Sequence, residues 1–233
     1  MTMLNDFLPT SATWGVLLTL AAFALGTFIN RKTGKAIFNP LLLGTGFVIV
    51  FLSVCSIPYA DYKASASPVS YLLLPATVSL AVPLYEKWDL LRKNVLAIVM
   101  GILAGTLASL GSVLVLALLL KLDHSQYITL LPKSVTTAIS MDVSHELGGI
   151  AALTGAIVIL TGILGALMAE TVCKVCHITH PIARGIGIGT AAHAVGTSKA
   201  LQMGEVEGAM SGLAVAVAGV MTAILCPIFS SLI

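Results

Sequence analysis

The sequence predicts an all-α polytopic membrane protein. Only 9% of its 233 residues are charged, 58% are hydrophobic, and the mean hydropathy is +1.02. A soluble domain carries about 25% charged residues, so this chain lacks the charge to cover a water-exposed surface. A spanning helix needs about 20 mostly apolar residues. The chain therefore has room for roughly seven or eight membrane segments, and we expect residues 1–233 to form a single transmembrane domain.

Apolar runs separated by polar breaks locate the expected helices in chain order. Six such runs cover about 12–30, 37–57, 71–85, 95–120, 150–171 and 207–231. The third of them, YLLLPATVSLAVPLY, is short and contains two prolines. Two further stretches, 131–149 and 185–201, are too polar for ordinary spans. We expect each of these two to form a broken or re-entrant helix.

The first polar stretch, LPKSVTTAISMDVSHELGG (131–149), begins with a proline and a lysine. A charged side chain deep in a bilayer costs at least ~2.5–3.5 kcal/mol, so it usually faces a protein interior or a water-filled cavity. Proline favours the first turn of a helix. A helix starting at Pro132 would direct its free N–H groups, its positive dipole end and the Lys133 ammonium to one point. Three hydroxyl side chains would add donors there: Ser134, Thr136 and Thr137.

Such a convergence of donors predicts a binding site for a carboxylate or another small anion. The alternative is that Lys133 extends to the lipid headgroups and the hydroxyls bond to carbonyls of their own helix. Asp142, His145 and Glu146 share one face if the helix continues to them. They are candidates for proton coupling, because a His or a desolvated carboxyl can titrate near neutral pH. A solvated turn without a role is the alternative.

The second polar stretch contains GTAAHAVGTSKA (189–200), in which one histidine lies between two Gly-Thr pairs. Glycine permits a non-helical backbone and the close approach of a ligand. Non-helical backbone within a membrane is tolerated only where it is buried in protein or lines a cavity. We therefore expect His193, Thr197 and Ser198 to complete the anion site. A histidine held by a hydrogen bond in the core is the alternative for His193.

An internal similarity indicates a duplicated helix pair. LLPATVSLA (73–81) and LLPKSVTTA (130–138) share Leu, Leu, Pro, Val and Ala at an offset of 57 residues. Interrupted segments at corresponding positions of two halves are typical of transporter binding sites. The predicted repeat units are about 71–120 and 128–171, either parallel or inverted. Coincidence in a sequence of low diversity is the alternative.

Other motifs do not indicate a cofactor or an enzyme. CKVCH (173–177) has the spacing of a covalent haem attachment, but a loop of about a dozen residues between spans cannot form a haem pocket, and we interpret the match as chance. One His and two carboxylates without fixed geometry do not indicate a metal site. The small residues of GILAGTLA (101–108) are interpreted as helix contacts. A net charge of +2 does not indicate nucleic-acid binding.

Several motifs resemble the LrgB/CidB family of bacterial membrane proteins. They are LPKSVTTAI, LAVPLYE (80–86), RGIGIGTAAHAVGTSKA (184–200) and EGAMSGLA (207–214), and the similarity extends from NPLL at 39–42 to the C-terminus. Members of that family usually have SVTTPI where this chain has Ala138 in place of the proline. This departure removes a proline-enforced break and leaves the hydroxyl cluster intact.

The resemblance implies two different functions in the bacterial cytoplasmic (inner) membrane. The family was named for modulating murein hydrolases and cell lysis beside a small holin-like membrane protein of the LrgA/CidA type. A similar plant plastidial protein exchanges glycolate and glycerate, and bacterial relatives are linked to pyruvate uptake. The placement of Lys133 and its hydroxyl neighbours favours a carrier of small monocarboxylates. The small predicted bundle favours a homo-oligomer, most simply a dimer.

Overall fold

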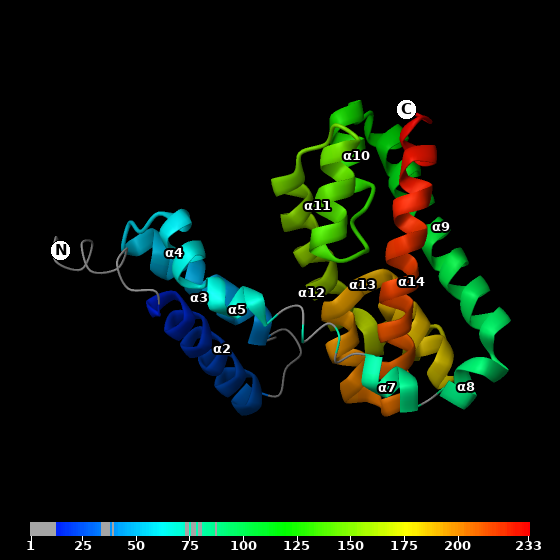
Figure 1. Ribbon diagram of the computed structural model, residues 1–233, viewed down its shortest axis with the longest axis horizontal. Coiled ribbons are helices and arrows are strands. Elements are labelled where there is room, and N and C mark those ends of the chain that lie inside the picture. The colour runs from blue at the N-terminus through cyan, green and yellow to red at the C-terminus, as the bar shows by residue number, and fades with distance from the viewer. Residues whose placement is uncertain are drawn as a thin grey trace. The chain divides into compact units, whose positions relative to one another are not determined.

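The computed structural model describes residues 13–33, 38, 40–72, 75, 78, 81–86 and 88–233, and in this part of the chain the regular structure is helical throughout. The chain divides into two compact units, Met1–Ser79 and Leu80–Ile233 (Figure 1). The polar stretches identified in the sequence both lie in the second unit, which therefore contains the candidate site.

The first unit contains four described helices: α2 (Trp14–Thr33), α3 (Pro40–Val54), α4 (Tyr59–Ser65) and α5 (Ser67–Tyr71). α2 and α3 approach each other closely at Gly26, where an added Cβ would lie 2.7 Å from the Pro40 carbonyl oxygen. The Thr19 hydroxyl on α2 and the Tyr62 hydroxyl on α4 form a hydrogen bond of 2.8 Å. A cavity of about 350 Å³ between α2 and α3 has only apolar side chains and glycines in its lining. It is therefore unsuited to an anion.

The second unit contains two short helices followed by a bundle. Its helices are α7 (Ala81–Glu86), α8 (Trp88–Lys93), α9 (Val95–Leu120), α10 (His124–Leu130), α11 (Thr137–Glu146), α12 (Ala151–Val175), α13 (Pro181–Met203) and α14 (Glu205–Ser230). Within the described ranges, four helices are long and apolar enough to cross a membrane: α2, α9, α12 and α14. The predicted count of seven or eight segments is not confirmed, because both polar stretches fold back on themselves and the short apolar helix Pro40–Val54 is not among the four.

The first polar stretch forms the turn at 131–136 and α11, which together with the preceding α10 make a hairpin (Figure 1). α10 begins at a capping box, in which the Asp123 carboxylate accepts from the Gln126 amide and the Gln126 side chain accepts from the Asp123 amide. The Thr154 hydroxyl of α12 lies 2.9 Å from the Thr129 carbonyl of α10 and 2.7 Å from the Ser144 hydroxyl of α11. These buried hydrogen bonds attach both arms of the hairpin to α12.

The second polar stretch is also a hairpin, because α13 consists of two helical arms that meet at a break. His193 has φ 41° and ψ −140°, which breaks the helix into two arms, 181–192 and 194–203. A Cβ added at Gly196 would lie 2.9 Å from Ile188 Cγ2, whereas eight residues of straight helix span about 12 Å. The arms therefore double back on each other at His193.

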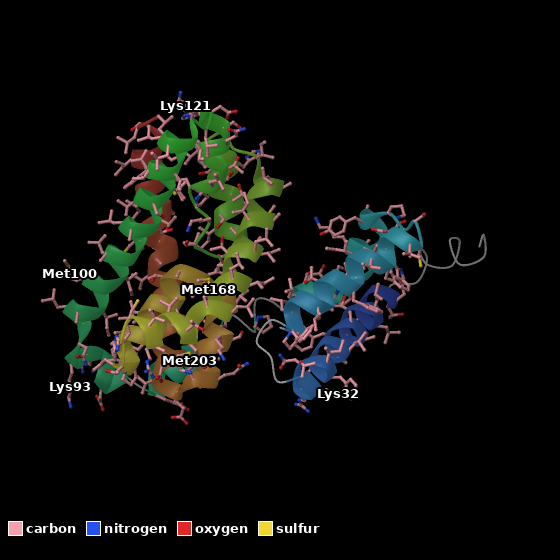
Figure 2. The ribbon with its side chains drawn as sticks, turned by 180° about the vertical axis from the view of Figure 1, so that it is seen from behind. Lys32, Lys93, Met100, Lys121, Met168 and Met203 are labelled. Carbon is pink, nitrogen blue, oxygen red and sulfur yellow. The ribbon has the colours of Figure 1, made fainter. Side chains whose placement is uncertain are left out.

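The order of one long helix and one hairpin occurs twice, as α9 with α10–α11 and α12 with α13. α9 and α14 run in the same direction, since the N-terminal halves of both contribute to one apolar cluster and the C-terminal halves of both to another. The first hairpin packs near the C-terminal ends of these two helices. Figure 2 shows Met203, the end of the second hairpin, toward the opposite end of α9, where Lys93 lies. The hairpins thus enter the bundle from opposite ends.

The predicted repeat units, 71–120 and 128–171, are not confirmed. Most of the first similar segment, 73–81, falls outside the described residues. The repeated order of elements in the structure has different boundaries, about 95–146 and 151–203.

Along α9 and α14, buried hydroxyl side chains separate two apolar clusters of the second unit. One cluster contains Ile98 and Ile102 of α9 with Met210 and Ala214 of α14, and the other contains Leu110 of α9 with Cys226 of α14. Between these clusters, the buried position on α9 is Thr106 and that on α14 is Thr222. The bundle therefore has buried hydroxyls where its apolar packing is interrupted.

The first arm of α13 packs on α14 through glycines that leave no room for a side chain. A Cβ at Gly189 would lie 2.5 Å from the Ser211 carbonyl oxygen, whereas nothing lies within 4 Å of one at Gly187. We expect Gly189→Ala to destabilise the protein by about 1–3 kcal/mol through overpacking. The control Gly187→Ala should be neutral or stabilising by up to about 1 kcal/mol. Thermal unfolding in detergent measures both, and equal effects would contradict the close packing.

Candidate functional site

Lys133 lies at the tip of the first hairpin, in the turn between α10 and α11. Its ammonium donates to the Ser134 hydroxyl at 3.0 Å and lies 3.4 Å from the Ser109 hydroxyl of α9. The Ser109 hydroxyl in turn donates to Ser134 at 2.9 Å. Ser134 is buried and Lys133 is half-buried. A cation and two hydroxyls from two separate elements thus meet at one point inside the bundle.

Among the described residues, no carboxylate forms an ion pair with Lys133. Lys199 differs, because its ammonium pairs with Glu170 of α12 at 2.5 Å. Arg184 also has a carboxylate nearby, with 3.8 Å between its guanidinium and Glu207. A partly buried cation without a counter-ion attracts an anion, so the Lys133 cluster is the strongest candidate for a binding site.

The start of α11 adds backbone donors to this cluster, although it lies later than expected. The helix begins at Thr137 and not at Pro132, because the chain first makes a turn in which the Lys133 amide donates to the Leu130 carbonyl. The Ser140 hydroxyl donates to the Pro132 carbonyl at 2.6 Å and holds this turn. Thr136 is the N-cap but its side chain caps no amide. The first-turn amides therefore remain available at a positive helix end.

His193 lies at the tip of the second hairpin and is buried. Its Nε2 forms a hydrogen bond of 2.9 Å with the Val158 carbonyl of α12. The ring lies against Gly162, where an added Cβ would be 2.7 Å from it. A non-glycine residue with this positive φ stores strain of about 1–3 kcal/mol and is typical of functional sites. The hydrogen bond to the core that was the alternative for this residue is present.

Thr197 and Ser198, the other predicted site residues of the second stretch, differ in burial and in hydrogen bonding. The Thr197 hydroxyl is buried and has two partners, the His193 carbonyl at 3.1 Å and the Ser211 hydroxyl at 2.9 Å. The Ser198 side chain is exposed and bonds only to the Ala194 carbonyl of its own arm, at 3.4 Å. The structure therefore does not bring Ser198 to the buried cluster.

The three residues considered for proton coupling are all on α11, which continues as far as Glu146. Asp142, His145 and Glu146 are exposed. None of them bonds to the Lys133 cluster within the described part of the chain, and α11 places them away from the tip, toward the base of the hairpin. The structure therefore places these three side chains on the outer side of a helix and not at the Lys133 cluster.

The tips of the two hairpins contact neighbouring turns of the same two long helices, α9 and α12. On α9, Ser109 bonds to Ser134 of the first tip, and Gly105, four residues earlier, packs against Thr190 of the second hairpin. On α12, a Cβ at Gly155 would be 3.6 Å from Thr137, and the Val158 carbonyl bonds to His193 three residues later. Three or four residues of helix span about 5–6 Å, so the tips lie about one turn apart along both helices.

Two residues of α9, Ser109 and Thr106, belong to this region but were not identified from the sequence. Ser109 bonds directly to the first tip. Thr106 is 3% exposed, and within the described part of the chain its hydroxyl oxygen has no hydrogen-bond partner. The inward stripe of α9 repeats every three to four residues from Ile98 to Ala117. A search for hydroxyls on that stripe would have identified Thr106.

The fold and the site define a class: a helical membrane protein in which two oppositely inserted hairpins hold polar side chains inside a bundle. The model of the LrgB-like family matches residues 19–232, and the chain belongs to this family. The resemblance identified from the motifs is thereby confirmed.

Relatives from Bacillus species are named antiholin-like proteins. The antiholin-like protein LrgB of Bacillus subtilis (strain 168) is 37% identical over 221 residues, which cover 94% of this chain and 96% of that protein. Antiholin-like LrgB proteins of Bacillus mycoides (strain KBAB4) and Bacillus cereus (strain B4264) are each 35% identical over 217 residues, covering 93% of this chain and 94% of the relative. No solved structure matches the chain significantly.

Proposed function

We propose that this chain is a membrane transporter of small monocarboxylates of the glycolate, glycerate, pyruvate and lactate type. The observation that carries the proposal is the partly buried ammonium of Lys133, which has hydroxyl partners and no carboxylate partner among the described residues. A bound carboxylate would supply the missing counter-charge. The hydroxyls of the tip and the first-turn amides of α11 would act as its further donors.

The hairpin arrangement supports transport rather than simple binding. Discontinuous helices whose broken ends face a shared site are typical of secondary transporters. In this chain the broken ends come from hairpins inserted from opposite ends of the bundle, so movement of either hairpin would open the site toward one side. The exposed positions of Asp142, His145 and Glu146 do not support proton coupling through them.

Reconstituted protein tests the proposal directly. Proteoliposomes containing the purified chain should take up labelled lactate in a saturable manner, and an excess of unlabelled pyruvate or glycolate should compete. Liposomes without protein, and liposomes with an unrelated helical membrane protein, are the controls. Uptake equal to these controls for all four acids would rule out the proposed transport in the isolated chain.

An antiholin-like function is the second candidate, and the names of the relatives favour it more directly than they favour transport. In this case the chain would regulate cell lysis together with a small holin-like membrane protein of the LrgA/CidA type. The chain would act in the bacterial inner membrane in both cases, and a homo-oligomer is compatible with both functions.

Co-expression separates the two candidates. A regulator should change the rate of lysis caused by a small holin-like protein, and Lys133→Met should leave this effect unchanged because the polar tip has no part in it. A transporter should lose uptake with the same substitution. An effect on lysis that persists beside absent uptake would establish the second candidate over the first.

A further inference from the structure

Thr106 is a buried hydroxyl that the fold itself does not use. Its side chain is 3% exposed, and the oxygen has no hydrogen-bond partner in the described part of the chain. A threonine within a helix can usually bond to the carbonyl four residues earlier, as Thr190 does with Ile186 at 2.8 Å. Leaving a buried hydroxyl unpaired is unfavourable, so we expect a ligand or a water molecule to bond to it.

The location of Thr106 connects it with the Lys133 cluster. It lies on the inward stripe of α9, between Ile102 of one apolar cluster and Leu110 of the other. Ser109, three residues later, bonds to the first hairpin tip. Side chains three apart on a helix have Cβ atoms about 5–6 Å from each other. A small molecule bound to Ser109 and Lys133 would therefore extend to Thr106.

We propose that Thr106 binds the 2-oxygen of the ligand and so selects 2-hydroxy and 2-oxo monocarboxylates over unsubstituted ones. The inference rests on the proposed transport function and adds a specificity-determining residue to it. In these acids the 2-oxygen is on the carbon next to the carboxylate. A carboxylate held by Lys133 and Ser109 would direct this adjacent oxygen toward Thr106, whose Cβ lies about 5–6 Å from that of Ser109.

The chemistry of a hydroxyl suits both kinds of ligand. It donates to a 2-oxo group and accepts from a 2-hydroxy group. A site with a buried hydrogen-bonding group rejects a ligand that leaves this group unpaired, whereas an apolar pocket discriminates weakly. Lactate and propionate differ only by the 2-hydroxyl, and they are therefore the informative pair.

The test measures the ratio of lactate to propionate uptake in proteoliposomes. The native chain should prefer lactate, and the isosteric Thr106→Val should lower this preference by about tenfold by losing lactate uptake while propionate uptake is kept. Thr106→Ser keeps the hydroxyl and should retain the preference. Thr190→Val is the matched control, because that hydroxyl already bonds to its own helix, and it should leave the ratio unchanged.

An unchanged ratio in Thr106→Val would overturn the inference and indicate that only a water molecule occupies the position. Competition by unlabelled propionate against labelled lactate in the native chain tests the selectivity without any variant, and equal competition by propionate and pyruvate would also overturn it. Absence of saturable uptake of every acid by the native chain would instead contradict the proposed transport, so the two failures are distinct.

Discussion

Replacing Lys133 with methionine is expected to lower saturable lactate uptake by about tenfold to a hundredfold, because hydrogen bonds to a charged group contribute about 1.5–3 kcal/mol. Methionine keeps an unbranched stem and removes the ammonium. The fold should not suffer, since a partly buried cation without a counter-ion is unfavourable and its removal is neutral or stabilising. We therefore expect thermal unfolding at an equal or higher temperature together with lost uptake.

The two measurements distinguish a binding role from a structural one. A structural Lys133 would lower the unfolding temperature and reduce the yield of folded protein in the methionine variant. Lys174→Met is the matched control, because the Lys174 side chain is 78% exposed and its contact with Glu170 is long, at 3.9 Å. Its uptake should equal that of the native chain. Native uptake in Lys133→Met would falsify the assignment of this residue to the site.

Substitution of His193 is expected to reverse the usual stability order of glycine and alanine. Both variants lose the ring that bonds to the Val158 carbonyl and contacts Gly162, so both should be less stable than the native chain. Glycine, however, adopts φ 41° and ψ −140° with less strain than alanine. His193→Gly should therefore be more stable than His193→Ala by about 1–3 kcal/mol, as measured by thermal unfolding in detergent.

An ordinary helix position provides the comparison. Ala156 is exposed within α12, and Ala156→Gly should lower stability by about 1 kcal/mol. If glycine proved less stable than alanine at His193 as well, α13 would continue through this position as a regular helix. The hairpin interpretation of the second polar stretch would then be wrong.

Hydropathy located the long helices well, whereas the predicted number of membrane segments is not confirmed. The run predicted at about 95–120 is α9, Val95–Leu120, and the ends of those predicted at about 150–171 and 207–231 agree with α12 and α14 within four residues. The length of an apolar run is sufficient to locate a membrane-spanning helix. It does not reveal that a polar-interrupted stretch turns back, since this depends on a single backbone conformation, such as that of His193, and on packing between distant arms.

The candidate site was only partly predictable, for a similar reason. Lys133 and Ser134 could be identified because charge is rare in this chain, and their local sequence places them at a break. The sequence could not show that the Ser198 side chain is exposed, because its orientation depends on how the second arm of α13 packs. Ser109 and Thr106 were missed since isolated hydroxyls in an apolar helix usually bond to their own backbone. Only the tertiary structure shows that Ser109 bonds elsewhere and that Thr106 has no partner.

The length of the α13 arms has a consequence for access to the site. At 1.5 Å per residue, arms of 181–192 and 194–203 are about 18 and 15 Å long, close to half of the ~30 Å hydrocarbon thickness of a bilayer. The ion pairs at Glu170 and Glu207 lie near the base of this hairpin, where water would tolerate them. If the base of the hairpin lies at the membrane interface, arms of this length would place His193 near the bilayer centre. In the proposed transporter, a solute arriving from either compartment would then cross only about half of the barrier before reaching the hairpin tips.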